Sequence, residues 1–307
     1  MDRRIEYIIT KEQAGLTIAE VLKQKGFSTK LITYVKMLEK GLTIEGNQVL
    51  TNHIVHENER LHVNIIDDYK TEKIIPVKMD LDIVYEDEDI IIINKAANMP
   101  IHPSQGNYDN TLANGIAYYY KEKGENFIYR CINRLDRDTT GLLILAKNKL
   151  SACILANMVS KREIHREYLA VTEGIVSEEG TIIAPIARLD GSTIERCVNF
   201  DHGDYAKTFY KRIDYKDNYS LVALKLETGR THQIRVHMKY IGHPLVGDTL
   251  YNEKELNSNM YRQALHSHHL GFKHPLTKKY KEFYSTLPND MQKMFNNIEF
   301  KTSKFIV

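Results

Sequence analysis

The chain has 307 residues, and its 42 Lys and Arg against 40 Asp and Glu give a net charge of +2. A hydrophobic content of 42% and a charged content of 27% allow a real core and exclude a disordered or collagen-like chain. The length suits about two domains of roughly 150 residues each. So small a net charge does not indicate a nucleic-acid partner, so any such partner must meet local basic patches.

The cysteines are Cys131, Cys153 and Cys197, an odd number spread far apart, which excludes a disulfide framework and a Cys-x-x-Cys metal clip. The first residues lack the apolar stretch of a secretory signal. No apolar run approaches the roughly 18 residues that a membrane-spanning helix needs. We therefore expect a soluble, cytoplasmic protein without a membrane partner.

The first elements in chain order form a small unit. Apolar residues recur at helical spacing between residues 15 and 40, and Gly26 and Ser28 interrupt them, which predicts two short helices. Residues 42–50 alternate around a Gly-Asn turn and residues 60–65 alternate again, which predicts a hairpin and a further strand. Residues 1–66 are therefore expected to form a small α+β domain.

A lysine-rich stretch lies on the predicted helices. Five lysines and one acid occur between residues 23 and 40, and the apolar face of this stretch must point inward. The pattern is equally typical of a solvated helix face and of a surface that faces RNA. Lys23, Lys30 and Lys36 are the candidate RNA contacts.

Residues 67–80 are charged, lack periodicity and contain Pro76, which predicts a linker before a larger domain at residues 81–307. Strands outnumber helices there without regular βαβ alternation, which predicts an α+β fold with a mixed, mostly antiparallel central sheet. Strands are expected at 83–85, 90–93, 128–132, 141–146, 168–171, 208–213 and 221–226, and helices at 111–123 and 149–159.

Three polar segments could carry chemistry. The first, Asn133-Arg-Leu-Asp-Arg-Asp-Thr-Thr-Gly141, is a loop between strand-like runs, where active sites often lie. Alone, such a loop is also typical of a solvated charged turn. Its two carboxylates alternate with two guanidiniums, namely Asp136 and Asp138 with Arg134 and Arg137.

The second segment spans residues 227–237 and gathers basic side chains next to Gly229, which permits close approach of a ligand to the backbone. These side chains are Arg230, His232, Arg235 and His237. The third segment leads into a strand-like run with Tyr168, for which a buried, hydrogen-bonded hydroxyl is the default expectation.

These segments closely resemble motifs of the RluA/RluD family of pseudouridine synthases, in the same order. The matching stretches are Asn133 to Leu143, Arg166-Glu-Tyr-Leu-Ala-Val171 and Leu226-Glu-Thr-Gly-Arg-Thr-His-Gln-Ile-Arg-Val-His-Met238, and further agreement lies at 84–90, 242–251 and 264–266. The resemblance covers about residues 81–290. The N-terminal unit is similar to the small RNA-binding domain that ribosomal protein S-four typifies.

The resemblance implies an RNA pseudouridine synthase, which needs no cofactor because isomerisation involves no net redox or group transfer. It implies that Asp136 is the essential aspartate, that Tyr168 is the active-site tyrosine and that Arg235 pairs with the aspartate. It also implies that Arg134 helps to hold the target uridine out of its stack. Arg137, Arg230 and His232 are further candidate RNA contacts.

The implied chemistry requires the uridine to leave the RNA stack. A guanidinium beside Asp136 would favour the ionised carboxylate, which can act as nucleophile or base. Attack on the sugar, attack on the ring and removal of a sugar proton all stay open. Tyr168 could stack on the flipped base or move a proton, and we expect stacking first.

Two features depart from the family pattern: Asn133 replaces a histidine, and Lys95-Ala-Ala-Asn98 replaces Lys-Pro-x-Gly. Neither removes Asp136, Tyr168 or Arg235, so we expect activity to survive. Large-subunit ribosomal RNA is the expected substrate, and transfer RNA is the second candidate. The expected oligomeric state is a monomer.

Two rival functions remain. One is a non-catalytic RNA-binding or ribosome-assembly protein on the same scaffold. The other is a hydrolytic glycosidase that uses Asp136 with Asp138, since two extended-loop carboxylates could approach the roughly 5 Å spacing of retaining enzymes. A metal site is not expected, because the neighbouring His266, His268 and His269 lack a carboxylate or cysteine at ligand spacing.

Overall fold

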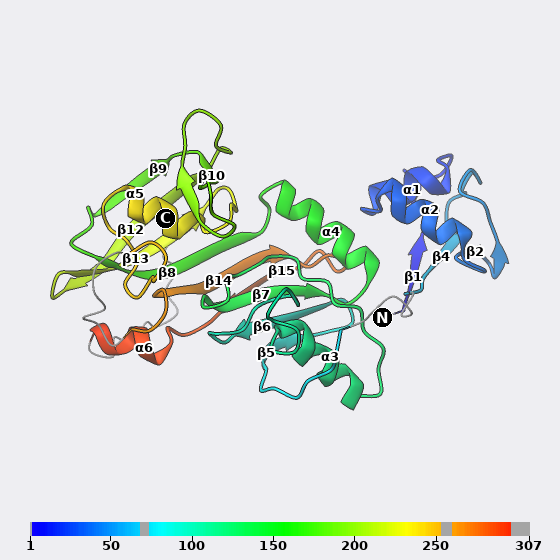
Figure 1. Cartoon of the computed structure of the whole chain (residues 1–307). Coiled ribbons are helices and arrows are strands. Elements are labelled where there is room, and N and C mark those ends of the chain that lie inside the picture. The colour runs from blue at the N-terminus through cyan, green and yellow to red at the C-terminus, as the bar shows by residue number, and fades with distance from the viewer. Residues whose placement is uncertain (1, 68–73, 253–259, 296–307) are drawn as a thin grey trace.

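The computed structural model describes residues 2–67, 74–252 and 260–295 (Figure 1). Residues 68–73 of the predicted linker lie outside this range. The described residues form two sheets of three or more strands, one with four strands near the N-terminus and one with nine. Among the described helices, none has the length and apolarity that crossing a membrane requires.

The four-stranded sheet has the order β1-β4-β2-β3, with antiparallel pairing throughout. Two helices precede the hairpin, as predicted, and strand β1 adds an edge that the sequence analysis did not identify. Its bounds and those of its neighbours are β1 Arg3–Ile8, α1 Ile18–Gln24, α2 Thr29–Met37, β2 Leu42–Ile44, β3 Asn47–Gln48 and β4 Arg60–Ile65.

The nine-stranded sheet has the order β5-β6-β7-β14-β8-β13-β12-β9, and β15 pairs with β14 beside this path. Among the described strands, only β14 and β7 pair in parallel, so the predicted mixed, mostly antiparallel α+β fold is confirmed. The strands are β5 Asp82–Glu86, β6 Ile90–Lys95, β7 Thr140–Ala146, β8 His165–Glu173, β9 Glu179–Ile183, β12 Lys207–Lys216, β13 Tyr219–Leu226, β14 Leu265–Lys273 and β15 Tyr280–Tyr284.

Within the described ranges, helical segments and a small hairpin accompany this sheet. They are α3 Leu112–Glu122, α4 Lys149–Ser160, α5 Gln233–Tyr240, α6 Asn289–Gln292, a 3-10 turn at Lys293–Phe295, and the hairpin of β10 Ile186–Arg188 and β11 Arg196–Val198. In Figure 1, α3 and α4 lie on opposite sides of β6 and β7. The predicted helices at 111–123 and 149–159 are thus confirmed as α3 and α4.

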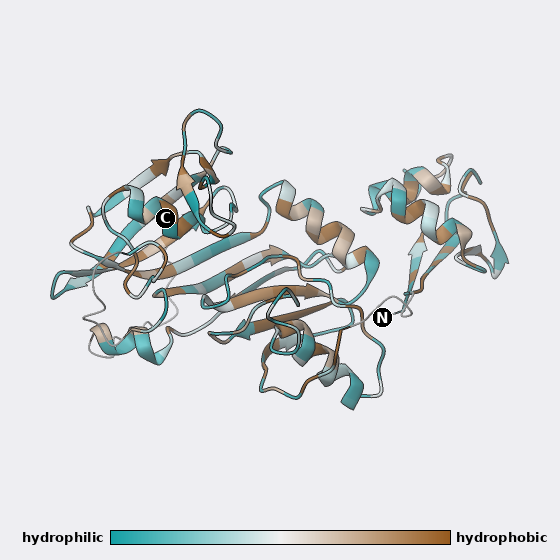
Figure 2. Ribbon diagram, viewed as in Figure 1, coloured by the Kyte–Doolittle hydropathy of each residue, from teal (hydrophilic) through white to brown (hydrophobic). Residues whose placement is uncertain are grey.

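The central strands are apolar on both faces because each face is covered, and Figure 2 shows the brown apolar colour along β6 and β7. Ile90 and Ile92 pack on the side of α4, whereas Ile91 and Ile93 pack on the side of α3. All four side chains are 0–1% exposed. The alternation along one strand therefore divides the core into two layers.

The N-terminal unit and α4 share one of these layers. Ile154 of α4 lies so close to Gly26 that a Cβ on this glycine would come within 2.9 Å of its Cγ1. Gly26 also has a φ of +95°, which favours glycine. Two ion pairs flank the contact, from Arg3 Nε to Asp89 Oδ1 at 3.1 Å and from Arg130 Nη2 to Asp67 Oδ1 at 2.6 Å.

The prediction of a regular strand at residues 128–132 is wrong. One edge of β7 pairs with β14 at Thr140 and Gly141, and the rest of that edge does not pair with β14. Residues 130–132 fill that place with two backbone hydrogen bonds, to Ile144 and from Ala146, and a bridge between Cys131 and Leu145. The space is too short for a full ladder.

Candidate active site

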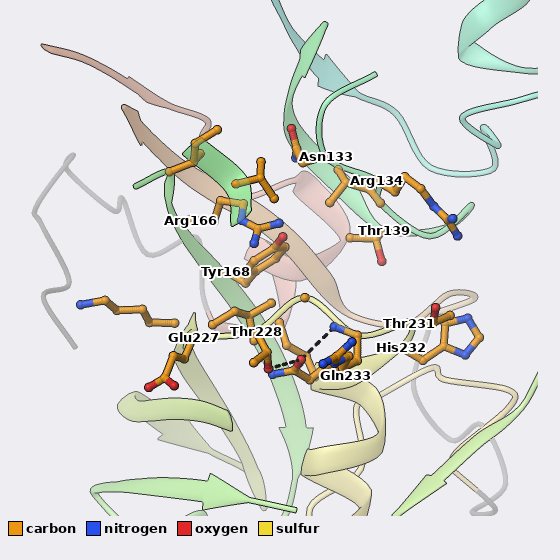
Figure 3. Close-up of a pocket in the computed structure, with 18 of the residues that line it drawn as sticks. Asn133, Arg134, Thr139, Arg166, Tyr168, Glu227, Thr228, Thr231, His232 and Gln233 are labelled. Atoms are coloured by element: carbon orange, nitrogen blue, oxygen red, sulfur yellow. Dashed lines mark hydrogen bonds between the residues drawn. The ribbon is translucent and has the colours of Figure 1, made fainter. Parts of the chain in front are cut away.

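A cavity of about 640 Å³ opens beside the central sheet. Its walls are the loop after Asn133, the beginning of β8, and residues 226–235 before and within α5. Figure 3 shows Tyr168 next to Arg166, with Arg134 and Thr139 across the cavity and Thr228 and Gln233 below. The three polar segments of the sequence analysis therefore meet in one place.

The Asp136 loop is fixed at both ends. Asn133 is 4% exposed, and its Oδ1 accepts a 2.9 Å hydrogen bond from the amide of Ile144 in β7. At the other end, Gln263 Nε2 donates to the Thr139 hydroxyl at 3.2 Å. The residue that replaces the family histidine thus attaches this loop to the sheet, and the Asp136 side chain remains 26% exposed toward the cavity.

Lys95 supports the same loop from below. It is 1% exposed, and its Nζ donates to the carbonyls of Ala96, Met99 and Arg137 at 2.7, 3.0 and 2.8 Å. Burial lowers the pKa of Lys95 to about 7, although the charges of Asp138 and Asp136 oppose this shift. The three carbonyls match the three donors of the ammonium form.

The turn after Lys95 departs from Lys-Pro-x-Gly and has a left-handed residue at its fourth position. Asn98 stands where the family motif has glycine, and it takes a φ of +54°. Asparagine enters the left-handed region more readily than other side chains. The turn supplies two of the carbonyl groups around Lys95, those of Ala96 and Met99, and the Asp136 loop supplies the third.

Arg235 joins Asp136 to the interior of the protein. Its Nη1 donates to Asp136 Oδ2 at 3.1 Å, and its Nε and Nη2 donate to the two oxygens of Asp248 at 2.7 and 2.8 Å. The Asp248 side chain is 0% exposed. Burial lowers the pKa of Arg235, but Asp248 and then Asp136 raise it overall, so the guanidinium stays charged.

Gln233 fixes the segment that carries Arg235. Its Oε1 accepts from the Arg230 amide and the Thr228 hydroxyl, and its Nε2 donates to Lys207 and Thr208. The dashed lines in Figure 3 mark such bonds around Gln233. All the hydrogen-bonding atoms of this buried amide are satisfied, so the entry to α5 has one defined position.

Tyr168 belongs to β8, where it pairs with Leu224 and Ser267 of the neighbouring strands. Its side chain lines the cavity while the residue is 4% exposed, and it packs in the same apolar cluster as Ile234. A flat ring in the wall of a polar cavity is suited to stacking on a base.

The remaining predicted residues fall into three places. Arg134, Arg230 and His232 line the cavity, and Arg134 and Arg230 are exposed. Arg137 is not among the lining residues and pairs with Asp138 at 3.0 Å. The candidate RNA contacts of the N-terminal unit lie exposed beside or within α1 and α2 and do not line this cavity, namely Lys23, Lys30 and Lys36.

The sequence analysis assigned no role to Asp248, Tyr251 or Arg166. Asp248 holds Arg235, Tyr251 contacts His232, and Arg166 lines the cavity. Asp248 and Tyr251 belong to the family-like stretch at 242–251, whose polar residues were the available signal.

Two of the neighbouring histidines of β14 hydrogen-bond to other strands or loops, and the third lies near a carboxylate. His266 Nδ1 lies 2.8 Å from the Thr140 hydroxyl, His268 Nδ1 lies 2.6 Å from the Ser285 carbonyl, and His269 Nε2 lies 3.5 Å from Glu282. Burial lowers the pKa of all three, which favours neutral rings that hold strands together.

Comparison with known proteins identifies the family. The family model for RNA pseudouridylate synthase matches residues 89–240. YjbO of Bacillus subtilis, an uncharacterised RNA pseudouridine synthase, is 40% identical over 280 residues, which cover 91% of this chain and 98% of that protein. Ribosomal large subunit pseudouridine synthase D of Zymomonas mobilis is 41% identical over 72% of this chain and 73% of its own.

A solved structure agrees with these sequence relatives. Human RNA pseudouridylate synthase domain containing 1 matches with a TM-score of 0.58 and 28% identity over 67% of this chain and 83% of that one. The predicted enzyme class is thus confirmed, while the similarity of residues 1–66 to the ribosomal protein S-four domain stays a prediction. The chain belongs to the RNA pseudouridine synthase family, whose motifs it resembles.

Proposed function

We propose that this enzyme isomerises uridines in large-subunit ribosomal RNA and that Asp136 is the reacting carboxylate. The observation that carries the proposal is the Arg235 bridge, which joins the partly exposed carboxylate of Asp136 to the buried carboxylate of Asp248. The substrate class follows from the relatives named for the large ribosomal subunit.

The reaction breaks the bond between N1 of uracil and C1′ of ribose and forms a bond from C5 to C1′. The hydrogen of C5 leaves and N1 gains one, so atoms and electrons balance without a cofactor. The uridine must first leave its stack, at a cost of a few kcal/mol. The cavity of about 640 Å³ has room for a flipped nucleotide.

Each lining residue then has a task. Asp136 acts on the sugar or the ring as nucleophile or base, and a hydrogen bond from Arg235 Nη1 orients its carboxylate. Tyr168 stacks on the flipped uracil. Arg134 at the exposed rim enters the space that the base leaves, and Arg230 binds a flanking phosphate.

Asp138 is the less suitable carboxylate. It does not line the cavity, and Arg137 donates to its Oδ2 from Nε and Nη2 at 3.1 and 3.0 Å. A hydrolytic pair of Asp136 and Asp138 would need both oxygens to face the same sugar. This arrangement favours isomerisation through Asp136 alone.

The test is release of tritium from RNA labelled at C5 of uridine. Wild type should release tritium from ribosomal RNA, and Asp136→Asn should reduce the single-turnover rate by at least about 10⁴-fold. Asp138→Asn is the matched control and should retain activity. Preferred release from transfer RNA would overturn the substrate class, and an active Asp136→Asn would overturn the role of Asp136.

A further inference from the structure

The Tyr251 hydroxyl lies behind the Asp136 site and has two partners. Its oxygen accepts a 2.8 Å hydrogen bond from the Arg196 amide, which can only donate. The same oxygen lies 2.8 Å from Nδ1 of His232. Tyr251 is 4% exposed, and a buried hydroxyl proton needs an acceptor. His232 Nδ1 is the acceptor that these contacts offer.

This arrangement determines where the proton of the neutral imidazole sits. If Nδ1 accepts, the ring proton must be on Nε2. That nitrogen lies 3.8 Å from Asp136 Oδ2, beyond hydrogen-bond length, whereas Arg235 already donates to the same oxygen at 3.1 Å. Among the described residues, neither an ion pair nor a hydrogen bond reaches Asp136 Oδ1.

We propose that Tyr251 and His232 are positioning residues for Asp136. Tyr251 holds His232 with its proton on Nε2, and His232 donates that proton to Oδ2 in a hydrogen bond when RNA fills the pocket. Oδ1 then remains for the reaction. This inference rests on the proposed role of Asp136, and it gives His232 a role other than the RNA contact predicted from the sequence.

The backbone supports a specific role for His232. It has a φ of +56° at the N-cap position of α5, a left-handed conformation that is unfavourable for a residue other than glycine. Such a conformation persists where surrounding contacts fix it, and it is common at active sites. Here the bonds of Gln233, the next residue, and the Tyr251 hydroxyl fix it.

Burial favours the neutral form of the His232 ring. Burial lowers the pKa of His232, the charge of Asp136 opposes this, and Arg235 lowers the pKa further. Asp248 and Arg196 contribute smaller effects of opposite sign. A neutral ring is the form in which the choice of tautomer has a consequence.

Tyr251→Phe is a clean variant. The Arg235 guanidinium lies 4.9 Å from the centre of the Tyr251 ring, and the ring packs with Val236, so the variant keeps both contacts and loses only the hydroxyl. Tyr240→Phe is the matched control, because Tyr240 is 52% exposed at the end of α5 and does not line the catalytic cavity.

Kinetics form the first arm, with single-turnover rates measured at saturating RNA. Tyr251→Phe should slow isomerisation by about 3- to 10-fold and His232→Ala by about 10- to 100-fold, the loss expected for a neutral and a charge-assisted hydrogen bond. His232→Gln should recover much of the rate, since its amide can donate. The Kd for RNA should change less than about twofold. Unchanged rates in Tyr251→Phe and His232→Ala would overturn the proposal.

Nitrogen NMR of the full-length protein forms the second arm and needs no activity. The ring signals of His232, identified by their loss in His232→Gln, should show a proton on Nε2 and none on Nδ1. Tyr251→Phe should shift this signal toward a mixture of tautomers, and Tyr240→Phe should not. A proton on Nδ1 in the wild type would overturn the tautomer assignment, whereas an inactive wild type would refute the proposed function instead.

Discussion

The Asp136 site and the lysine surface of α1 and α2, which consists of Lys23, Lys30 and Lys36, differ in the burial and pairing of their charged side chains. The Arg235 and Asp248 side chains are 8% and 0% exposed, and each has several partners. Lys23, Lys30 and Lys36 are exposed, and among the described residues neither a hydrogen bond nor an ion pair occupies them. Chemistry on one atom requires a fixed charge, whereas RNA binding gains from charges that are free to replace counterions.

Loss of the Asp248 carboxylate should disturb the Asp136 site and produce the largest effect of the changes considered. Asp248→Asn leaves the buried Arg235 with a weaker partner, so the free energy of unfolding should fall by about 3–5 kcal/mol. The single-turnover rate should fall about 100-fold or more, because Asp136 loses its support. Urea unfolding and tritium release measure the two effects.

The control for that experiment is Asp138→Asn. Its partner Arg137 has a side chain that is 59% exposed, so the pair contributes at most about 1 kcal/mol. Equal destabilisation by the two variants would contradict the distinction between a buried and an exposed pair.

The pH dependence of the free energy of unfolding should reveal the titration of Lys95, which is buried. Its pKa is about 7 in the folded state and about 10.4 in the unfolded state, so between these values the unfolded chain binds more protons. Stability from this group therefore rises with pH across that window and is lowest below pH 7. The advantage of wild type over Lys95→Met should grow from pH 7 to 10, by no more than about 5 kcal/mol.

Urea unfolding of both proteins at several pH values measures this difference. A difference that stays constant between pH 7 and 10 would mean that Lys95 remains an ammonium ion throughout, held by its three carbonyl acceptors. The direct comparison cancels the titration of all other groups.

Neutralising the lysine surface should affect RNA binding and should produce the smallest effect. Replacing Lys23, Lys30 and Lys36 together by Gln should weaken RNA binding and reduce the salt dependence of log K by about two to three. Stability should change by less than about 0.5 kcal/mol, and the rate at saturating RNA should not change.

Binding measured at two salt concentrations tests this prediction. Lys121→Gln with Lys211→Gln, two exposed lysines of the large sheet region, controls for a general loss of charge. Equal losses in both variants would argue against a specific role of the N-terminal unit in RNA binding.

Local patterns predicted most of the fold. The apolar runs at 90–93 and 141–146 gave buried strands, and the caps at Thr111 and Asn148 start α3 and α4 close to the expected residues. The sequence analysis did not predict strand β1, because charged residues make up part of its alternating pattern and its partner β4 lies over fifty residues away. Residues 128–132 look like a strand, but the space along β7 is shared with β14.

The site was predictable only in part. Asp136, Tyr168 and Arg235 came from resemblance to a family, and the structure brings all three to one cavity. Asp248 and Tyr251 could not be assigned, because Gly247-Asp248 reads locally as a turn. Their partners Arg235 and His232 lie 13 and 19 residues away, a relation that only the folded chain creates.

Helix α4 links the stability of the N-terminal unit to that of the catalytic region. Its apolar residues complete the core of the N-terminal unit, while residues at and after its C-terminal end, Ser160 and Arg162, form the rim of the catalytic cavity. Deleting the N-terminal unit would expose Ile154 and Met158 to water. The two units should consequently melt together, and an isolated catalytic fragment should be prone to aggregate.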